Sequence, residues 1–466
     1  GFQSFGQSNV DTLHPRHRQK LDAVVVGSAD GIDMALVFDM RMGNSASSLE
    51  DASRAYLTVW WNSYKDEYKA KVESAKKLGP VVDEEFPDLI DRYVAKGTPI
   101  IRAFLRDYIT HRDSLNREMA TLQSTIAISI DHQHKVVKKV KGKAATQSFS
   151  IMGDGGLVLG HYAVPSSEMK WVHTAMMEVV ERHGAVLHDG THMPLTRGNL
   201  PPVIYVDKDC CNGHVGGRND VNKWLYGMLK KLDPFHMMNR IGGNVNSEHP
   251  RKGGLMRNLS KSIYTDSQED TAALADAREK GGITNLSPQQ IKDDRIKRVR
   301  KVIVDPNKIA AKMLLTTKKE MALDRQAKLQ HQANGESCID LPKGHDAYPV
   351  VTGKVLNALT NQCTHVLNGC VHDEVGMNIS VNRTNYRGTG VLLAENKSMR
   401  GTNKNEYLHS YQDRVFYSMK NIRQGYYNAR AHWSISNWNR RRLETMGRPS
   451  LSPDGGLLLP TSRRID

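Results

Sequence analysis

The sequence lacks any long apolar run. No stretch of about 18 consecutive apolar residues occurs, which is the minimum for a membrane-spanning helix, and the mean hydropathy is −0.53. We therefore predict that no segment crosses a membrane. No signal-peptide pattern opens the given sequence, which begins at Gly1 rather than at a methionine.

Cysteine is also scarce. There are five cysteines in 466 residues, and two of them, Cys210 and Cys211, are adjacent. An odd number with this spacing excludes the small disulfide-rich secreted class. Free thiols are typical of a reducing compartment, so we expect a nuclear protein if the source is eukaryotic and a cytoplasmic one otherwise.

Acidic residues are fewer than basic ones, at 50 against 65, which gives a net charge of +15. With a pI near 9.4, the balance favours a polyanionic partner, and DNA is the first candidate. A basic protein with no such partner is the alternative.

The N-terminal region, residues 1–123, has a helical pattern. We expect a helix over Ile32–Met42, a turn at Gly43–Ser45 with capping residues, and a long amphipathic helix over Leu49–Leu78. Further helices are expected over Phe86–Ala95, Ile100–Asp107 and Ser114–Gln123. A helix, a turn and a second helix could read DNA, or they could simply pack as a bundle.

A change to strand-like patterning follows at Thr125. Three strands are predicted, over Thr125–Asp131, Ala145–Met152 and Leu157–Val164, with a hairpin signal at Asp154–Gly156 between the last two. An amphipathic helix is predicted over Glu168–His183. A helical connection between strands of one sheet gives a right-handed unit.

The stretch Pro202–Asp209 is the strongest strand signal in the chain. Val203–Val206 is β-branched and aromatic without alternation, which is typical of a strand buried on both faces. Asp207 then lies at the carboxyl end of a central strand, where α/β sheets place their chemistry. We predict a helix over Asp220–Lys231 and a fifth strand over Leu232–His236.

The second half of the chain is mostly helical and basic. The run Arg295–Lys301 is a candidate for following a phosphate backbone or for nuclear import, with a solvated helix face as the simpler alternative. Arg400–His409 begins a helix that places Glu406 in its first turns, and more helix is expected up to Leu443. A Pro-, Ser- and Gly-rich tail follows from Gly447.

Two strand-terminal acids, Asp131 and Asp207, and the later Glu406 form a candidate site. Three carboxylates that converge repel one another, so they require a cation to stay ionised together. Mg²⁺ prefers such oxygen ligands, and two ions can support an in-line phosphoryl transfer.

This order of motifs resembles the RNase H-like fold of DDE transposases and retroviral integrases, and more narrowly the KDZ-like transposase-derived proteins. The resemblance covers Thr125 to Leu443. It is carried by Ile130-Asp131 with Lys135 and Val136, by Ile204–Asp207 with Cys210-Cys211, by Leu232–Arg240, by Gly369-Cys370 leading to Arg400–Asn403 with Glu406 and His409, and by Trp438–Arg440.

The resemblance implies an α/β mixed sheet flanked by helices, with an N-terminal helical domain and a helical insertion before the last catalytic helix. The core would span residues 124–245 and 396–446, the basic insertion residues 246–395, and the flexible tail residues 447–466. Asp131, Asp207 and Glu406 would hold two Mg²⁺ or Mn²⁺ ions. DNA phosphates or the leaving strand would lie near Lys135, His236, Arg240, Arg400, Lys404 and His409.

The implied function is metal-dependent cleavage and transfer of DNA strands, at transposon ends or in genomic DNA, by a homodimer or higher oligomer. Two alternatives stay open. One is a domesticated DNA-binding protein whose core is a catalytically silent scaffold. The other is a different RNase H-like nuclease, which would need a fourth acid such as Asp209 or Asp233; Glu395 and Asp413 also compete with Glu406.

A repeated Cys-x-His pattern, Cys363/His365 and Cys370/His372, raises the question of zinc. Two thiolates and two imidazoles satisfy a tetrahedral site. A single residue between ligands makes chelation awkward, however, so we expect a buried thiol with nearby surface histidines rather than a zinc site.

Overall fold

The protein is described from a computed structural model. The described residues are 23–25, 31–55, 58–59, 62, 66, 97–142, 145–187, 194–207, 210–211, 224–303, 305–337, 341–373, 378–398, 400–417 and 419–447. The predicted helix over Phe86–Ala95, the tryptophans at 60 and 61, and nearly all of the predicted tail lie outside them.

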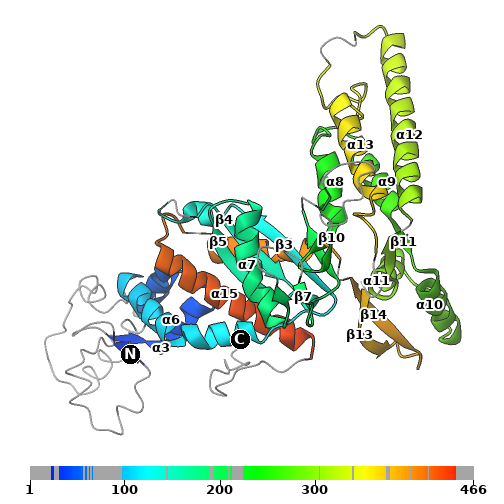
Figure 1. The fold of residues 1–466 in the computed structure, drawn as a ribbon. Helices are drawn as coiled ribbons and strands as arrows, with labels where there is room; N and C mark the ends of the chain where they lie inside the picture. The colour runs from blue at the N-terminus through cyan, green and yellow to red at the C-terminus, as the bar shows by residue number, and fades with distance from the viewer. Residues whose placement is uncertain are drawn as a thin grey trace, which may run out of the picture.

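A mixed six-stranded sheet forms the centre of the molecule, in the order β5-β4-β3-β8-β10-β9 (Figure 1). Neighbours β3, β4 and β5 pair antiparallel, whereas β8 runs parallel to β3 and β10 runs parallel to β8. The strands are β3 (Ala127–Gln133), β4 (Gln147–Met152), β5 (Val158–Val164), β8 (Val203–Val206), β9 (Trp224–Leu225) and β10 (Met228–Leu232). This confirms the predicted α/β class, with a mixed sheet flanked by helices.

The two faces of β3 differ in chemistry. Ile128 and Ile130 enter the main hydrophobic core with Val172 and Met176 of helix α7 (Met169–Arg182). Alternation along the strand sends Ser129 and Asp131 to the opposite face, which is covered by α14 (Asn403–Val415). One strand therefore supplies apolar packing on one side and a buried carboxyl on the other.

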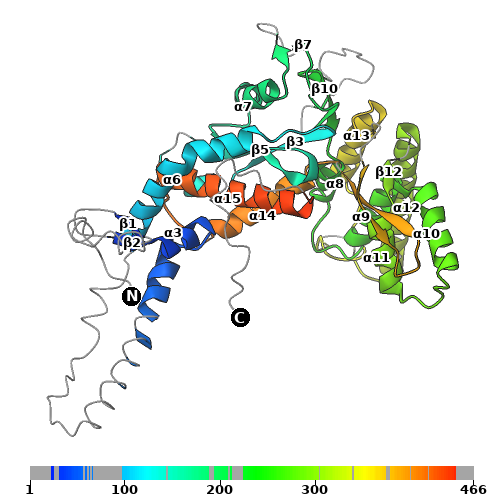
Figure 2. The same ribbon diagram turned by 90° about the horizontal axis from the view of Figure 1, so that it is seen from below.

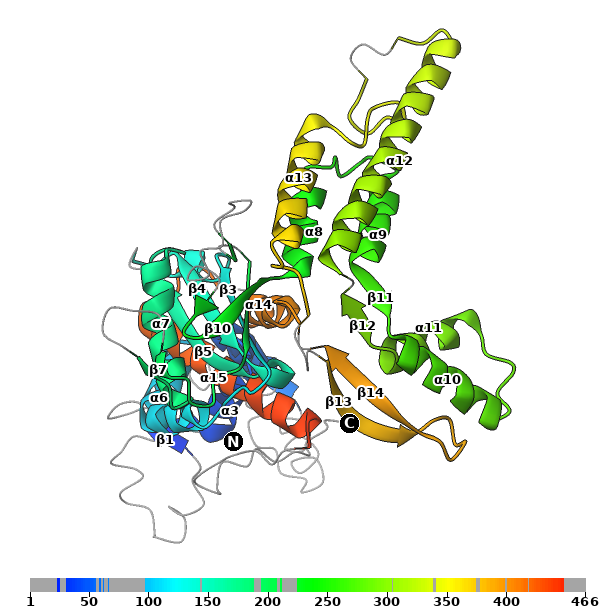
Figure 3. The same ribbon diagram turned by 45° about the vertical axis from the view of Figure 1, so that its right-hand side comes forward.

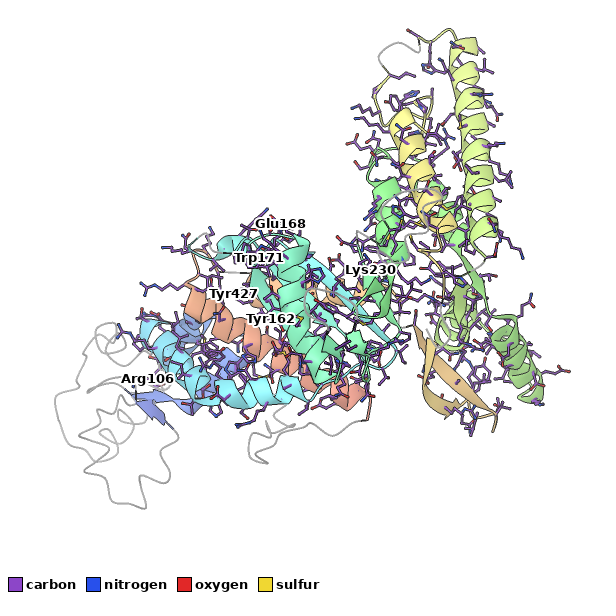
Figure 4. All side chains as sticks on the ribbon, viewed as in Figure 1. Arg106, Tyr162, Glu168, Trp171, Lys230 and Tyr427 are labelled. Carbon is purple, nitrogen blue, oxygen red and sulfur yellow. The ribbon has the colours of Figure 1, made fainter. Side chains whose placement is uncertain are left out.

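Packing against this core extends to its margins. Tyr162 on β5 and Trp171 on α7, both labelled in Figure 4, are partly buried against the main core cluster. The Tyr162 hydroxyl donates to Glu178 on α7 at 2.8 Å. Tyr427, from α15 (Gln424–Thr445), is buried in a separate cluster with Phe416.

Three predicted strands, a helix and a fourth strand are confirmed between residues 127 and 206, and β8 is buried on both faces. The helix predicted over Asp220–Lys231 is wrong where it is described, because β9 and β10 form a hairpin there. Tyr226 and Gly227, both at positive φ, make its tight turn. The fifth strand was predicted over Leu232–His236, but the observed strand, β10, ends at Leu232.

Pro234 explains why the predicted strand could not continue. Asp233 accepts from the Phe235 amide at 3.0 Å and caps helix α8 (Pro234–Gly242), in which proline occupies the first turn. The segment predicted as Leu232–His236 is therefore a strand end followed by a helix start.

The N-terminal elements pack on the core through one long helix. Residues Ile100–Asp107 and Ser114–Gln123 were predicted as two helices, but one helix, α6 (Gly97–Ala120), joins them without a break and ends three residues before Gln123. It packs against α3 (Met34–Arg41) and α15, and Arg41 forms a buried ion pair with Asp107. Strands β1 (Ala23–Val25) and β2 (Gly31–Asp33) pair beside them. Figure 2 shows α6 and α15 running side by side.

The chain between β10 and α14 forms a second body, which projects from the sheet (Figure 3). It contains helices joined by two small antiparallel sheets, and residues 246–395, predicted as a helical insertion, lie within it. Its elements after α8 are α9 (Lys252–Ile263), β11 (Tyr264–Asp266), α10 (Gln268–Lys280), α11 (Pro288–Arg298), β12 (Lys301–Ile303), α12 (Pro306–Ala333), α13 (Gly353–Leu367), β13 (Asn378–Asn385) and β14 (Leu392–Ser398).

The basic run Arg295–Lys301 is paired with acids on the surface of this body. Lys297 pairs with Glu395, Arg300 pairs with Asp270, and Arg295 and Lys301 both pair with Asp266. Arg295, Lys297 and Lys301 remain exposed, so the run is a solvated face whose charges have acidic partners. Among the described helices, none combines the length and apolarity needed to cross a bilayer.

Candidate metal centre at the ends of β3 and β8

Asp131 and Asp207 lie level with each other on neighbouring parallel strands. The register pairs Ser129 with Tyr205, and two residues further along both strands come the two acids. Asp131 is buried, with 4% of its surface exposed, and its Oδ1 accepts from the His132 amide at 2.7 Å. Asp131 therefore lies within β3, two residues before its end, and Asp207 directly follows β8, so both acids lie toward the same end of two central strands.

Helix α14 brings Glu406 to the same place. The neighbouring Asn405 is fully buried and holds the helix on the sheet. Its Oδ1 accepts from the Ser129 hydroxyl at 2.7 Å, and its Nδ2 donates to Ser150 Oγ at 3.0 Å. These buried hydrogen bonds fix which face of α14 meets β3, and they leave the Glu406 side chain 47% exposed above Asp131.

His236, at the start of α8, completes the group. Its Nδ1 lies 2.9 Å from Asp233 Oδ2, and since a carboxylate only accepts, the imidazole donates there. The Thr402 hydroxyl donates to the same Asp233 oxygen at 2.5 Å. This arrangement turns His236 Nε2 toward Glu406, whose Oε1 is 3.9 Å away.

Electrostatics show how closely these groups interact. The pKa of Asp131 rises to about 7, chiefly because of burial; the charges of Asp207 and Glu406 act in the same direction, while the charge of His236 and the His132 amide oppose the shift. For His236, burial alone would lower the pKa, but Asp233, Asp131 and Asp207 raise it above its usual value. The negative charge at the sheet edge thus favours a bound cation.

The donor atoms can reach one ion. One oxygen each of Asp131 and Glu406 and one nitrogen of His236 all lie within 4.8 Å of one another. Two carboxylates and an imidazole fit a divalent cation, and the imidazole suits Mn²⁺ better than Mg²⁺. Asp207 lies outside this trio, although its charge acts on both Asp131 and His236.

His409, expected near DNA phosphates, lies instead beneath the carboxylates. It is 7% exposed, and its Nδ1 is 3.8 Å from Asp131 Oδ2. Burial, together with the nearby His161 and His132, lowers the pKa of His409 to about 3. A neutral, buried imidazole supports the site from below and does not offer a charge to a phosphate.

Arg400 also departs from the expectation of a phosphate contact. Its guanidinium is buried, pairs with Asp373 and donates to the Lys301 carbonyl at 2.5 Å. It is a junction between β12, β14 and the segment after α13. The sequence could not show this, because the partners are about 30 and 100 residues away.

The other predicted DNA contacts have different surroundings. Arg240 donates to the Asp207 carbonyl, so it shapes the segment that carries the second acid. Lys135 is exposed and lies 3.5 Å from Asp413. Lys404 is half-buried on α14, with its side chain near Gly156.

The competing acids have other partners where they are described. Asp413 accepts from Gln133 at 2.9 Å, Glu395 pairs with Lys297, and Asp233 holds His236. Asp209 lies outside the described residues. Sequence reasoning missed Asp233 and Asn405 as positioning residues; the serines at 129 and 150, polar positions within buried strands, were the available signal for a polar clamp.

The predicted Cys-x-His quartet is not brought together as a set. Cys363 is buried on α13 and His372 is exposed, and neither joins a ligand group. His365 and Cys370 instead meet Cys210 and Cys211, which follow β8.

No protein-family model matches this chain, and no curated protein matches it.

Proposed function

We propose that this chain is a metal-dependent enzyme that cuts or joins DNA strands, built on an RNase H-like core of the DDE transposase type. The observation that carries the proposal is the close approach of Asp131, Glu406 and His236, with the charge of Asp207 acting on Asp131. The three acids come from β3, from the residue after β8 and from α14, which follows the insertion.

The strand order supports the RNase H-like interpretation. Numbered in chain order from β3, the six strands of the sheet lie in the order 3-2-1-4-6-5. Without the two-residue edge strand β9 the order is 3-2-1-4-5, with the first three strands antiparallel and β8 and β10 parallel to β3. Such folds bind substrates at the carboxyl ends of the strands, and Asp131 and Asp207 both lie toward that end of β3 and β8. Fold alone does not determine activity, so the proposal depends on the acids.

A divalent cation held here would activate the attacking oxygen and stabilise the leaving oxygen of a phosphodiester. The protein's own residues prepare the site for it. Asp131 supplies a buried carboxyl that is unfavourable to ionise alone, and Glu406 supplies a more exposed one. Asp233 fixes the orientation of His236, as a carboxylate commonly does for a metal-binding histidine.

The test is a strand-cleavage assay with the full chain. Supercoiled plasmid and end-labelled duplex are incubated with Mg²⁺ or Mn²⁺, and nicking and joining are followed on gels. We expect cation-dependent products that fall by about 10³-fold in Asp207→Asn and Glu406→Gln, since a lost metal ligand costs several kcal/mol of transition-state stabilisation. Glu444→Gln, at an exposed position on α15, is the matched control.

Two outcomes separate the alternatives. Equal activity in wild type, Asp207→Asn and Glu406→Gln contradicts the catalytic assignment. Salt-sensitive DNA binding with neither cleavage nor stabilisation by Mn²⁺ supports the silent-scaffold alternative.

A further inference from the structure

We propose that Cys210, Cys211, His365 and Cys370 bind a structural zinc ion that ties the segment after β8 to the last helix of the insertion. This is a second metal site, distinct from the carboxylate centre in its ligands. Its test does not depend on any catalytic activity.

The ligand atoms already have the spacing of a tetrahedral site. The sulfurs of Cys210 and Cys211 lie 3.3 and 3.2 Å from His365 Nδ1, and with Cys370 all four atoms lie within 4.8 Å of one another. Zn–S bonds of about 2.3 Å and Zn–N bonds of about 2.0 Å place tetrahedral S and N ligands about 3.5 Å apart. Three thiolates and one imidazole are a common structural zinc set.

Local structure prepares both halves of the site. Helix α13 ends at Leu367, and Gly369 at a φ of +72° turns the chain back so that the Cys370 amide donates to the His365 carbonyl at 3.0 Å. This turn brings two ligands, five positions apart, onto one side of the helix end. Cys210 and Cys211 supply the other two; although they are adjacent in sequence, both sulfurs face His365 Nδ1 in the folded chain.

The surroundings hold the two halves together at the sheet edge. The Leu232 amide donates to the Cys370 carbonyl at 2.9 Å, and Lys231 Nζ donates to the Gly369 carbonyl at 3.1 Å. The turn after α13 is thereby attached to the end of β10, the strand next to β8. Asn368 Nδ2 lies 3.7 Å from Cys211 Sγ and donates to it, which is the outer-shell contact expected for a metal-bound thiolate.

The position of the cluster suggests what the ion does. Cys210 follows Asp207 by three residues, whereas His365 is 155 residues later in the chain. Closing so long a loop is entropically costly, and a metal that binds only the folded state offsets this cost. The zinc would fix the insertion against the core and hold the segment that carries Asp207.

Measurement of bound metal in the wild-type chain comes first. The full chain is produced in zinc-supplemented medium, purified under reducing conditions and analysed by inductively coupled plasma mass spectrometry. We expect one zinc per chain. Exchange into Co²⁺ should give the visible absorption of a tetrahedral site together with thiolate-to-cobalt charge-transfer bands. This spectrum requires no variant, so a folding defect cannot obscure it.

Variants then assign the ligands. Cys211→Ser and His365→Asn should lose the zinc, whereas Cys363→Ser should keep it, because Cys363 lies on the same helix but outside the group. Zinc well below one per chain with no tetrahedral cobalt spectrum overturns the proposal. Unchanged zinc in His365→Asn also overturns it, as does a Cys210–Cys370 disulfide in wild-type protein purified under reducing conditions.

Discussion

At the scale of single residues, Asp131 is the most deeply buried of the three acids Asp131, Asp207 and Glu406. Its carboxyl is buried between β3 and α14, and two other acids act on it, so its pKa rises to about 7. A carboxyl that resists ionisation without a cation becomes a strong ligand when the cation arrives. The same property makes it costly to the metal-free fold.

This cost yields a prediction with a definite sign. The pKa of Asp131 is about 7 in the folded chain against an ordinary 3.8, so metal-free stability should fall as the pH rises from about 4 through about 7. Asp131→Asn removes the titration. In EDTA at pH 8, we expect this variant to be more stable than wild type by on the order of 2 to 4 kcal/mol, and at pH 4 the gain should vanish.

Urea unfolding with EDTA at pH 4 and pH 8 provides the check. Asp293→Asn, on the exposed face of α11, is the control. The electrostatic assignment fails if Asp131→Asn changes stability by the same amount at both pH values.

At the scale of elements, the start of α14 decides where Glu406 points. Gly401 has a φ of +71°, and a Cβ there would collide with the Asp233 carboxylate, which holds His236 and Thr402. Gly401, two residues before α14, is therefore confined both by its positive φ and by the hydrogen-bonded carboxylate of Asp233 beside it.

Gly401→Ala should disturb both metal binding and folding. Gly390→Ala is the matched control, because Gly390 has a φ of +81° but open space around its Cβ. We expect Gly390→Ala to cost about 1 kcal/mol from backbone strain alone. Gly401→Ala should cost at least about 2 kcal/mol more and should abolish the rise in melting temperature that Mn²⁺ gives wild type. Equal melting temperatures with Mn²⁺ in the two variants would contradict this role of Gly401.

Strong local patterns explain how much of the architecture the sequence predicts. The unbroken run Val203–Val206 and the hairpin signal at Asp154–Gly156 specify their elements without help from distant residues. The hairpin at Tyr226 and Gly227 was missed because its two-residue turn interrupts a segment whose spacing also fits a helix. Pro234, a first-turn residue, marks the helix start that the strand prediction overran.

The site was predictable only in its acids. Asp131, Asp207 and Glu406 follow from strand-like segments and a helix start; the structure brings Asp131 and Glu406 together with His236, and Asp207 acts on Asp131 through its charge. Asp233 and Asn405 act through contacts with segments far along the chain, as do the partners of Arg400. The cysteine cluster needed the same information, since residues 210 and 211 meet 365 and 370 only in the folded chain.

At the scale of the whole molecule, the insertion joins the core through polar as well as apolar contacts. Arg400 is the clearest case, as it is buried against Asp373 where the insertion returns to the core. The 65 basic side chains are thus not all available to DNA, because some of them, Arg400 among them, are paired with acids within the protein.

DNA binding should therefore distinguish Lys135 from Arg400. Lys135→Ala, at an exposed position, should lower the slope of log Kd against log salt by about one. Arg400→Ala should leave the slope unchanged but destabilise the fold by about 3 kcal/mol, since it leaves Asp373 without its partner. Fluorescence anisotropy over a salt series and urea unfolding measure the two effects. A slope lowered by Arg400→Ala alone would reverse the assignment.

The most direct test of the shared cation is anomalous diffraction from crystals of the full chain soaked in Mn²⁺. The account predicts an anomalous peak within coordination distance of Asp131 and Glu406, beside His236 and Asp207, and no such peak in Asp131→Asn crystals. Wild-type crystals with Mn²⁺ bound elsewhere and none among these residues would contradict it.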